Sequence, residues 1–570
     1  MLRPTTAIQR WPSTVSVLAC CVAAAISVAV DALFSAREGY LARPPWYDGA
    51  GYVFFARSDY ELLRGLHLHT LYDQLINAIT PGWNAAIAFQ YLIFGPGAWQ
   101  AFTVRFWPVA LLLILVYWIV SRRTSRSVAI LATTLTALLP MISAGVRSSS
   151  LEYVTSTSNY LESWYLDDLR PDIFAIALVL WSVAVLAEHG DAPSRSTYAV
   201  SAVFAVLAVL MKPSTSPLLL LVWGLALAVV WWRNRRRAGA TLDAAIGVAI
   251  LAVLLVPWAT LGGGVSSVVS YLYSASVTYG SVYGTSDNIA QRFGYFVVRI
   301  PTDLGPVEGW LAIAAAIAVT AALVRRRLGW AELIYGGVAA VTFLTFSLPT
   351  TRNTHLPEWT SMTLWVYAWA GIARLAASWR WPANRRPEPA VLAAAALYSM
   401  LVLGLGVISL AAWPANEHAA SGQQLSVTAA LAQELDRRIT AADCFVASPG
   451  PGWPASLQSE LVKSRGEAPG TIPIDPSAPP TAYVRAATGC AAVITFREDV
   501  SEVAQAFIAL PPYWPYYRAI DQWVRSPSSG YTLDQSWQFT DLPPYVEHPL
   551  GRYQGVSLTV DLFVRGPAHS

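Results

Sequence analysis

The chain has 570 residues, of which 55% are hydrophobic and only 13% are charged, and its formal net charge at pH 7 is +3. Soluble domains have about 25% charged residues, so this composition and a mean hydropathy of +0.43 exclude a wholly soluble protein. They favour an integral membrane protein, for which we expect membrane lipids as partners and no nucleic acid.

Long apolar runs fill residues 1–412. A helix needs about 20 predominantly apolar residues to cross the hydrocarbon core of a bilayer. The runs predict about eleven spans of this kind, near residues 15–34, 103–120, 128–146, 171–187, 197–211, 216–232, 243–261, 306–324, 330–348, 361–376 and 389–412. We therefore expect residues 1–412 to form an α-helical, polytopic transmembrane domain.

Arginine clusters indicate how these spans are oriented. They lie at the N-terminus (Arg3 and Arg10) and at 122–126, 233–237, 325–327 and 380–386. If the spans alternate in direction, all of these clusters fall on one side, which the positive-inside rule makes cytoplasmic. The sequence thus predicts a multi-pass protein of a bacterial inner membrane, with a cytoplasmic N-terminus and an extracytoplasmic segment after residue 412.

The first extracytoplasmic segment, 35–102, is long for a simple tether. It contains Asp48, in the sequence Pro44-Pro45-Trp46-Tyr47-Asp48-Gly49-Ala50-Gly51-Tyr52. An acid set among aromatic residues at the membrane surface is typical of a reactive site. Asp48 is therefore the first candidate catalytic residue, and this segment favours an enzyme over an anchor.

A second acidic group lies at the external end of the fourth span. Asp167 and Asp168 precede Arg170, Pro171 and Asp172. The two acids beside an arginine are candidates for binding acceptor hydroxyls or a divalent ion, with Asp168 as a metal ligand. Alternatively, they complement the positive end of a helix dipole. Among other residues, His67 and His69 are weaker candidates for metal ligands, because residues i and i+2 do not share a helix face.

Lys212 is the only lysine in residues 1–412; the other lysine in the chain is Lys463. It lies at an external turn between two apolar runs, where a positive charge runs against the positive-inside rule. A charge near membrane depth is costly and indicates a functional role. The alternative is a lysine whose ammonium group reaches the lipid headgroups.

Residues 413–570 lack long apolar runs and predict a second, extracytoplasmic domain. Helical periodicity at 425–440 and 502–510 alternates with strand-like runs at 444–448, 491–496 and 556–564, which predicts a small α/β domain. Cys444 and Cys490 both lie here, and an oxidising compartment favours a disulfide between them over two free thiols.

Four groups of residues resemble the GT-C class of integral-membrane glycosyltransferases, close to the aminoarabinose transferase and protein mannosyltransferase group. The resemblance covers about residues 30–375 and follows the family's order: Asp48 with Tyr52 and Ala56-Arg57; Tyr91-Leu92-Ile93-Phe94-Gly95 with Val104-Arg105-Phe106; Leu210-Met211-Lys212-Pro213-Ser214; and Phe346-Ser347 with Arg352 and Leu356-Pro357. Asp48 is followed by Gly49, whereas the mannosyltransferases have Asp-Glu. This difference argues against protein O-mannosylation.

The resemblance implies a sugar donor carried on a polyprenyl phosphate. Asp48 would be the general base that takes the proton of the acceptor hydroxyl. Lys212, Arg352 and His355 would bind the donor phosphate and stabilise the charge that develops as it leaves. Trp46, Tyr47 and Tyr52 would stack on sugar rings. Members of this class differ in their use of a metal, so a divalent ion remains an open expectation.

The expected function is transfer of a sugar from a polyprenyl-phosphate donor to a cell-envelope lipid or glycan acceptor, on the outer face of the membrane. A single displacement would invert the anomeric configuration. Two other classes stay open. One is a lipid or polysaccharide flippase or transporter, although the chain lacks an evident repeat. The other is a non-catalytic envelope-assembly protein whose tail carries the function.

Overall fold

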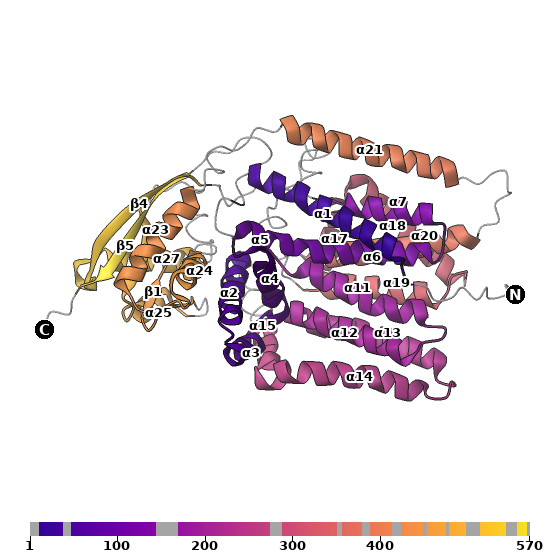
Figure 1. Ribbon diagram of the computed structural model, residues 1–570, viewed down its shortest axis with the longest axis horizontal. Coiled ribbons are helices and arrows are strands. Elements are labelled where there is room, and N and C mark those ends of the chain that lie inside the picture. The colour runs from indigo at the N-terminus through magenta and orange to yellow at the C-terminus, as the bar shows by residue number, and fades with distance from the viewer. Residues whose placement is uncertain are drawn as a thin grey trace.

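The computed structural model describes residues 11–37, 41, 47–143, 169–273, 288–325, 327–349, 356–378, 388–412, 423–447, 453–474, 478–497, 513–542 and 556–566. A bundle of long helices forms one body, and a sheet covered by helices lies beyond one end of it (Figure 1). The chain therefore has the predicted fold class, a polytopic helical protein with a small C-terminal α/β unit.

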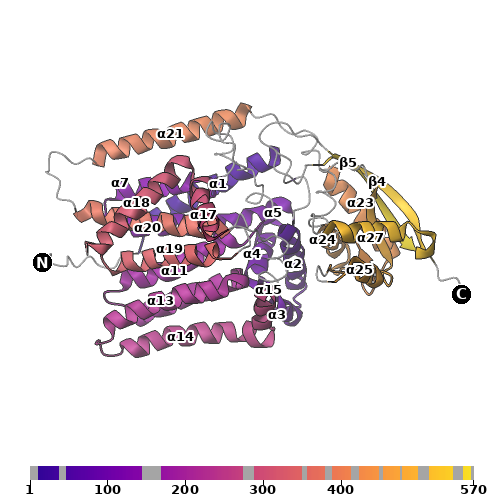
Figure 2. The same cartoon turned by 180° about the vertical axis from the view of Figure 1, so that it is seen from behind.

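Each predicted span overlaps a helix. In chain order these helices are α1 (Thr14–Arg37), α6 (Phe106–Ser121), α7 (Arg126–Ala137), α11 (Asp172–His189), α12 (Arg195–Met211), α13 (Ser216–Asn234), α14 (Ala240–Val256), α18 (Pro306–Val324), α19 (Trp330–Ser347), α20 (Leu356–Ser378) and α21 (Glu388–Ala412). In both views the long helices lie side by side with similar tilt (Figures 1 and 2).

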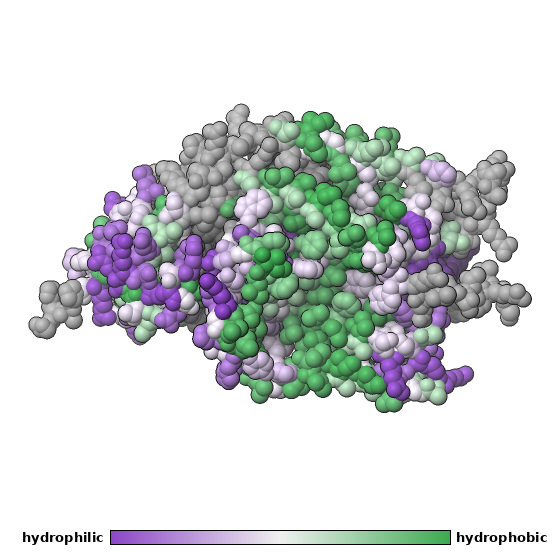
Figure 3. Space-filling view, in the orientation of Figure 1, coloured by the Kyte–Doolittle hydropathy of each residue, from purple (hydrophilic) through white to green (hydrophobic). Residues whose placement is uncertain are grey.

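Seven stretches of the described residues are long and apolar enough to cross a membrane. They are Thr14–Ala36, Trp99–Ser121, Asp172–His189, Pro213–Asn234, Ala240–Leu261, Pro306–Val324 and Trp330–Ser347. Arg195–Met211 and Ala393–Ile408 are apolar but shorter. Hydrophobic side chains cover the middle of the bundle on the face seen in Figure 3, as expected for a surface in contact with lipid. The protein is a multi-pass membrane protein, and the total of eleven spans stays a prediction.

The predicted span 128–146 is wrong in its extent. The helix α7 ends at Ala137, and the chain turns through residues 138–142. Pro140 explains the early end, because proline has no amide hydrogen to donate and disfavours helical geometry in the residue before it.

The segment 35–102, read from the sequence as a loop, is mostly helical. It contains α2 (Tyr47–Arg64), α3 (Leu68–Asn77), α4 (Pro81–Phe94) and α5 (Ala98–Phe102), followed by the short η2 (Thr103–Arg105). On the same side of the bundle, η4 (Pro257–Leu261) and α15 (Gly264–Tyr273) follow α14, and α17 (Ile289–Leu304) precedes α18. The helices α2, α3, α4 and α15 lie between the long helices and the sheet (Figure 1). The helix α17 packs beside α18 and α20.

The arginine clusters at 122–126, 233–237 and 325–327 flank one end of the bundle. Arg123 forms ion pairs with Glu188 at 2.7 Å and with Glu332 at 3.2 Å. Arg233 lies over the ring of Trp330, near the start of α19. Trp11, the first described residue, stacks on Trp118 and lies beside His189 at this end as well. The sheet lies beyond the other end of the bundle (Figure 2). This arrangement agrees with the alternation on which the predicted orientation depends.

The C-terminal unit has a five-stranded mixed sheet in the order β2-β1-β3-β5-β4. The strands β1 (Cys444–Val446), β2 (Gly470–Thr471) and β3 (Ala492–Arg497) are parallel, whereas β5 (Val556–Arg565) pairs antiparallel with β3 and β4 (Tyr531–Leu542). The strands predicted from 444, 491 and 556 onward are thus present. The last of them lies inside the sheet, between β3 and β4.

Helices cover both faces of this sheet. Successive strand residues point to opposite faces. Accordingly, Ile494 and Leu562 pack with α23 (Gln423–Arg438) and α24 (Trp453–Arg465), while Val493 and Phe563 pack with α25 (Pro480–Ala487) and α27 (Trp514–Val524). This explains why most residues of β3 are apolar, since both of its faces are buried. The predicted helix 425–440 is present as α23, and the predicted helix 502–510 lies outside the described residues.

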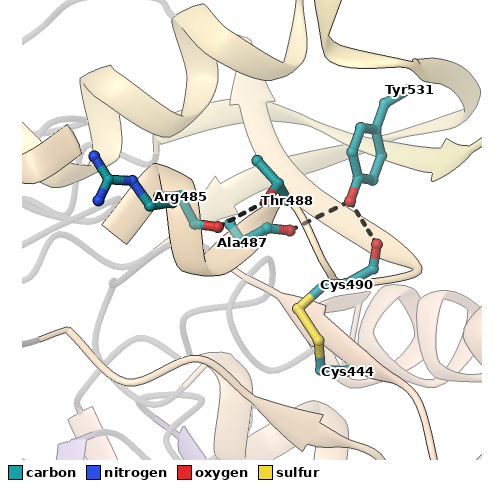
Figure 4. The surroundings of a disulfide bond; sticks show 6 residues. All are labelled: Cys444, Arg485, Ala487, Thr488, Cys490 and Tyr531. Carbon is teal, nitrogen blue, oxygen red and sulfur yellow. Dashed lines mark hydrogen bonds between the residues drawn. A yellow bond between two sulfur atoms is a disulfide. The ribbon is translucent and has the colours of Figure 1, made fainter. Parts of the chain in front are cut away.

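A disulfide joins Cys444 and Cys490, as the sequence predicts, with an S–S distance of 2.09 Å (Figure 4). It connects the first residue of β1 to the turn that precedes β3. The hydroxyl of Tyr531 donates hydrogen bonds to the backbone carbonyls of Cys490 and Ala487, at 2.5 and 3.3 Å. The disulfide therefore lies beside backbone that these two hydrogen bonds hold in place.

Candidate active site

Lys212 and Asp172 form a buried ion pair at the end of the bundle that faces the C-terminal unit. Lys212 follows the last residue of α12, and its Nζ lies 2.5 Å from Oδ2 of Asp172, in the first turn of α11. The indole Nε1 of Trp359, in α20, donates to the other carboxylate oxygen at 2.8 Å. A charge this deeply buried is tolerated because it is paired and hydrogen-bonded.

Two further carboxylates lie close to this pair. Glu358 is buried and interacts electrostatically with Asp172, Asp303, Lys212 and Arg170. Asp303, also buried, accepts a hydrogen bond from Ser361 at 2.7 Å. The ends of α11, α12, α17 and α20 thus bring acids and bases together at one place.

The start of α4 packs directly on this cluster. A Cβ on Gly82 would lie 3.0 Å from the backbone carbon of Leu210, which is tighter than most such contacts, so a larger residue would push these two segments apart. Trp83 is buried, and its indole donates to the carbonyl of Leu169 at 2.6 Å. Trp83 thereby joins α4 to the segment before α11.

Asp48 lies in the first turn of α2, which packs along α4. The start of α4 touches the residues directly before Lys212, so α2 lies at the same end of the bundle as this lysine. Tyr47 and Asp48 lie in the first turn of α2, with their side chains outside the described part of the chain, and Trp46 lies outside it as well. Tyr52 is half-buried against the helical core.

α2 also contacts the C-terminal unit, through α24. In α24, Leu457 and Leu461 face the sheet core, whereas Ser456, Ser459 and Val462 are buried although they project away from that core. Small serine side chains allow a second helix to lie close to this face. The helix that carries Asp48 is therefore packed between α4 and the C-terminal unit.

Of the other predicted site residues, one is described by the structure and four are not. Arg170 lies in the buried charged cluster with Lys212, as described above. Arg352, His355, Asp167 and Asp168 lie outside the described residues, so their roles stay predictions.

No group of three or more His, Cys, Asp or Glu side chains among the described residues could hold a metal ion. Asp172 is a poor ligand because Lys212 and Trp359 use both of its oxygens. His69 is exposed and pairs with Asp73 at 3.0 Å, and His67 precedes α3. A metal site at Asp168 remains untested.

Comparison with known proteins supplies the fold. No protein-family model matches the sequence, and no curated protein matches it. ArnT from Cupriavidus metallidurans bound to undecaprenyl phosphate matches over 96% of this chain and 98% of its own length, with a TM-score of 0.53 and 14% sequence identity. The chain has an ArnT-like, GT-C fold. ArnT in the apo state matches over 86% and 94% of the two chains, with a TM-score of 0.49 and 14% identity.

The ArnT-like fold confirms the resemblance read from the sequence. It extends that resemblance as well, because the match covers nearly the whole chain and thus includes the tail, which no motif had related to a known family. Sequence reasoning missed Glu358, Asp303 and the pairing of Lys212 with Asp172. A buried acid can be suspected from an isolated carboxylate beside an apolar run, as in Leu356-Pro357-Glu358-Trp359.

Proposed function

We propose that this protein transfers a sugar from a polyprenyl-phosphate donor to a cell-envelope lipid or glycan acceptor on the outer face of a bacterial inner membrane. The observation that carries the proposal is the buried Lys212–Asp172 pair at the helix ends of an ArnT-like fold. The similar ArnT structure is bound to undecaprenyl phosphate, which supports a polyprenyl-phosphate donor.

Lys212 acts on the leaving group in this proposal. An ammonium group has three N–H donors, and Asp172 accepts one of them. Asp172 and Trp359 fix the position of the ammonium, so its other donors meet the phosphate without reorganisation. When the glycosidic bond breaks, negative charge grows on the phosphate, and a fixed cation in a site with little water stabilises that charge. Arg352 and His355 are proposed as further phosphate contacts.

Asp48 acts on the acceptor. Its carboxylate takes the proton of the acceptor hydroxyl while the oxygen attacks the anomeric carbon and the bond to the phosphate breaks. The products are the glycosylated acceptor and the free polyprenyl phosphate, and a single displacement inverts the anomeric configuration. Asp167, Asp168 and Arg170 are proposed to orient acceptor hydroxyls. Trp46, Tyr47 and Tyr52 are proposed to stack on the sugar rings.

The proposed topology places the N-terminus in the cytoplasm and the unit after residue 412 outside it. Three arginine clusters at the same end of the bundle support this orientation. The α/β unit packs on α2, so we propose that it contributes to acceptor binding.

The test uses the full chain reconstituted in lipid vesicles with a polyprenyl-phosphate sugar and an envelope lipid extract. Appearance of a glycosylated product together with free polyprenyl phosphate supports the proposal. Movement of the donor across the bilayer without transfer would replace it with a flippase. If neither activity appears with any donor of this class, a non-catalytic assembly role takes its place.

A further inference from the structure

Two buried polar side chains face each other between α2 and α4. Arg57, in α2, is 5% exposed, and Tyr91, in α4, is 1% exposed. The guanidinium carbon of Arg57 lies 5.8 Å from the centre of the Tyr91 ring. The edge of Tyr60 also packs on this ring, at 6.1 Å between centroids. The contact therefore holds a positive charge in the interface between two helices.

Each of these two side chains has a buried polar atom that forms no hydrogen bond within the described part of the chain. The Nε of Arg57 and the hydroxyl of Tyr91 are both fully buried and have no hydrogen-bond partner there. Arg57 also has no ion pair with any carboxylate of the described residues. Leaving a charge buried and unpaired is costly, by several kcal/mol in typical cases. The contact between the guanidinium group and the Tyr91 ring offsets only part of this free-energy cost.

The nearest carboxylate in the sequence, Asp59, does not balance this charge. It is two residues from Arg57 and turns towards α3, where Gln74 donates to its Oδ1 at 2.8 Å. Burial raises the pKa of Asp59 to about 7, so a large share of this carboxyl group is neutral near physiological pH. A ligand of negative charge is then the natural partner of Arg57.

The two side chains together offer the donors that a phosphate group needs. A guanidinium group presents several N–H donors in a planar fork that matches phosphate oxygens, and a phenol adds one O–H donor from a different direction. A tetrahedral phosphate can accept from both directions. We propose that Arg57 and Tyr91 bind a phosphate group between α2 and α4.

This subsite is separate from the site at Lys212. Gly82, near the start of α4, touches the turn that holds Lys212, and Tyr91 is nine residues further along the same helix. At 1.5 Å per residue the two positions are about 13 Å apart along the helix axis. The proposal concerns binding alone, so it does not depend on the transferase function proposed above.

The phosphate can belong to a membrane lipid or be free in solution, and the experiment separates these sources. The full chain is placed in micelles of a phosphate-free maltoside detergent, in the same micelles with phosphatidic acid, and in the same micelles with inorganic phosphate. The unfolding temperature is measured in each. A ligand that binds the native state raises this temperature.

We expect a rise of a few degrees with phosphatidic acid or with inorganic phosphate, and the sample that responds identifies the source. Arg57→Gln should abolish the rise, and Tyr91→Phe should reduce it while keeping the ring. Arg64→Gln, which alters an arginine of the same helix with a 70% exposed side chain, should leave it intact. A rise that persists in Arg57→Gln but is lost in Lys212→Ala would belong to the other site and would overturn this proposal.

The proposal is overturned if neither form of phosphate raises the unfolding temperature, or if the rise is the same in wild type and Arg57→Gln. If Arg57→Gln does not fold, Tyr91→Phe and Arg57→Lys decide. An unchanged response in Tyr91→Phe together with an unchanged response in Arg57→Lys overturns the proposal, because each alters the donors that the phosphate would meet.

Discussion

Lys212 and Asp172 are 40 residues apart in the sequence, yet their side chains meet at 2.5 Å and join the end of α12 to the start of α11. Trp359 holds the same carboxylate from α20. Three helices are therefore fixed to one another through a single acid. The lysine that stands out in the sequence is part of a buried ion pair, which argues against a side chain that merely reaches lipid headgroups.

Lys212→Ala should lower both donor affinity and turnover, because its phosphate contact strengthens as charge develops. The substitution also leaves Asp172 buried without its partner, which typically costs about 3–5 kcal/mol of stability. The double variant Lys212→Met with Asp172→Asn removes both charges and should recover stability without recovering activity. Lys463→Ala, in the C-terminal unit, is the control for lysine loss. Wild-type kinetics in Lys212→Ala would exclude Lys212 from the reaction.

Asp48→Asn should reduce sugar transfer by about 10²–10⁴-fold, the usual effect of losing a general base. Donor binding should change little, since the side chain keeps its size and the base acts on the acceptor. Initial rates of transfer and the equilibrium affinity for the donor measure the two effects. Asp73→Asn, at an exposed acid of α3, is the matched control. If Asp48→Asn turns over normally, Asp167 and Asp168 become the next candidates for the base.

The long helices could be predicted from the sequence because each is apolar along its length, whether its side chains face protein or lipid. The helices of the segment 35–102 were missed. In α3 the apolar residues recur at helical spacing, so this helix could have been recognised in the sequence. Its position could not, because α3 has no buried residue and is held to α2 by Gln74, which bonds both Ser58 and Asp59.

The site was predictable only in part, for a similar reason. A single lysine in an apolar sequence can be recognised by its rarity, and so Lys212 was found. Its partner could not be chosen among the neighbouring acids, because the choice depends on how α11, α12 and α20 pack. Glu358 and Asp303 are far apart in the sequence and meet only after folding. The disulfide was predictable because few cysteines were available in the tail.

Asp59→Asn should change how stability depends on pH. Burial raises the pKa of Asp59 from its ordinary 3.8 to about 7. The folded protein then binds a proton that the unfolded chain has released, so stability falls as the pH rises from about 4 to above 7. Because asparagine does not titrate, Asp59→Asn should not show this fall in stability as the pH rises. Unfolding temperatures at pH 5 and pH 8 measure it, and an equal loss in wild type and Asp59→Asn would refute the assignment.

The disulfide should stabilise the C-terminal unit. It closes a loop with a sequence separation of 46, for which the chain-entropy model gives roughly 4 kcal/mol. The double variant Cys444→Ser with Cys490→Ser should lose stability of about this size or less, whereas Cys21→Ser should have little effect. Thiol labelling under denaturing conditions gives an independent measurement. Only Cys20 and Cys21 should react before reduction, and all four cysteines after it.

Substitution in α24 should affect α2, because Ser459 is buried on the face that projects away from the sheet core. Ser459→Leu inserts a larger side chain where α2 packs, and overpacking of this kind costs about 1–3 kcal/mol. We expect acceptor transfer to fall while donor affinity stays near wild type, since Lys212 is bound to other helices. Ser464→Leu alters an exposed serine of the same helix and should transfer normally. A Ser459→Leu variant with full acceptor transfer, or a chain truncated after residue 412 that retains it, would show that the C-terminal unit has no part in acceptor binding.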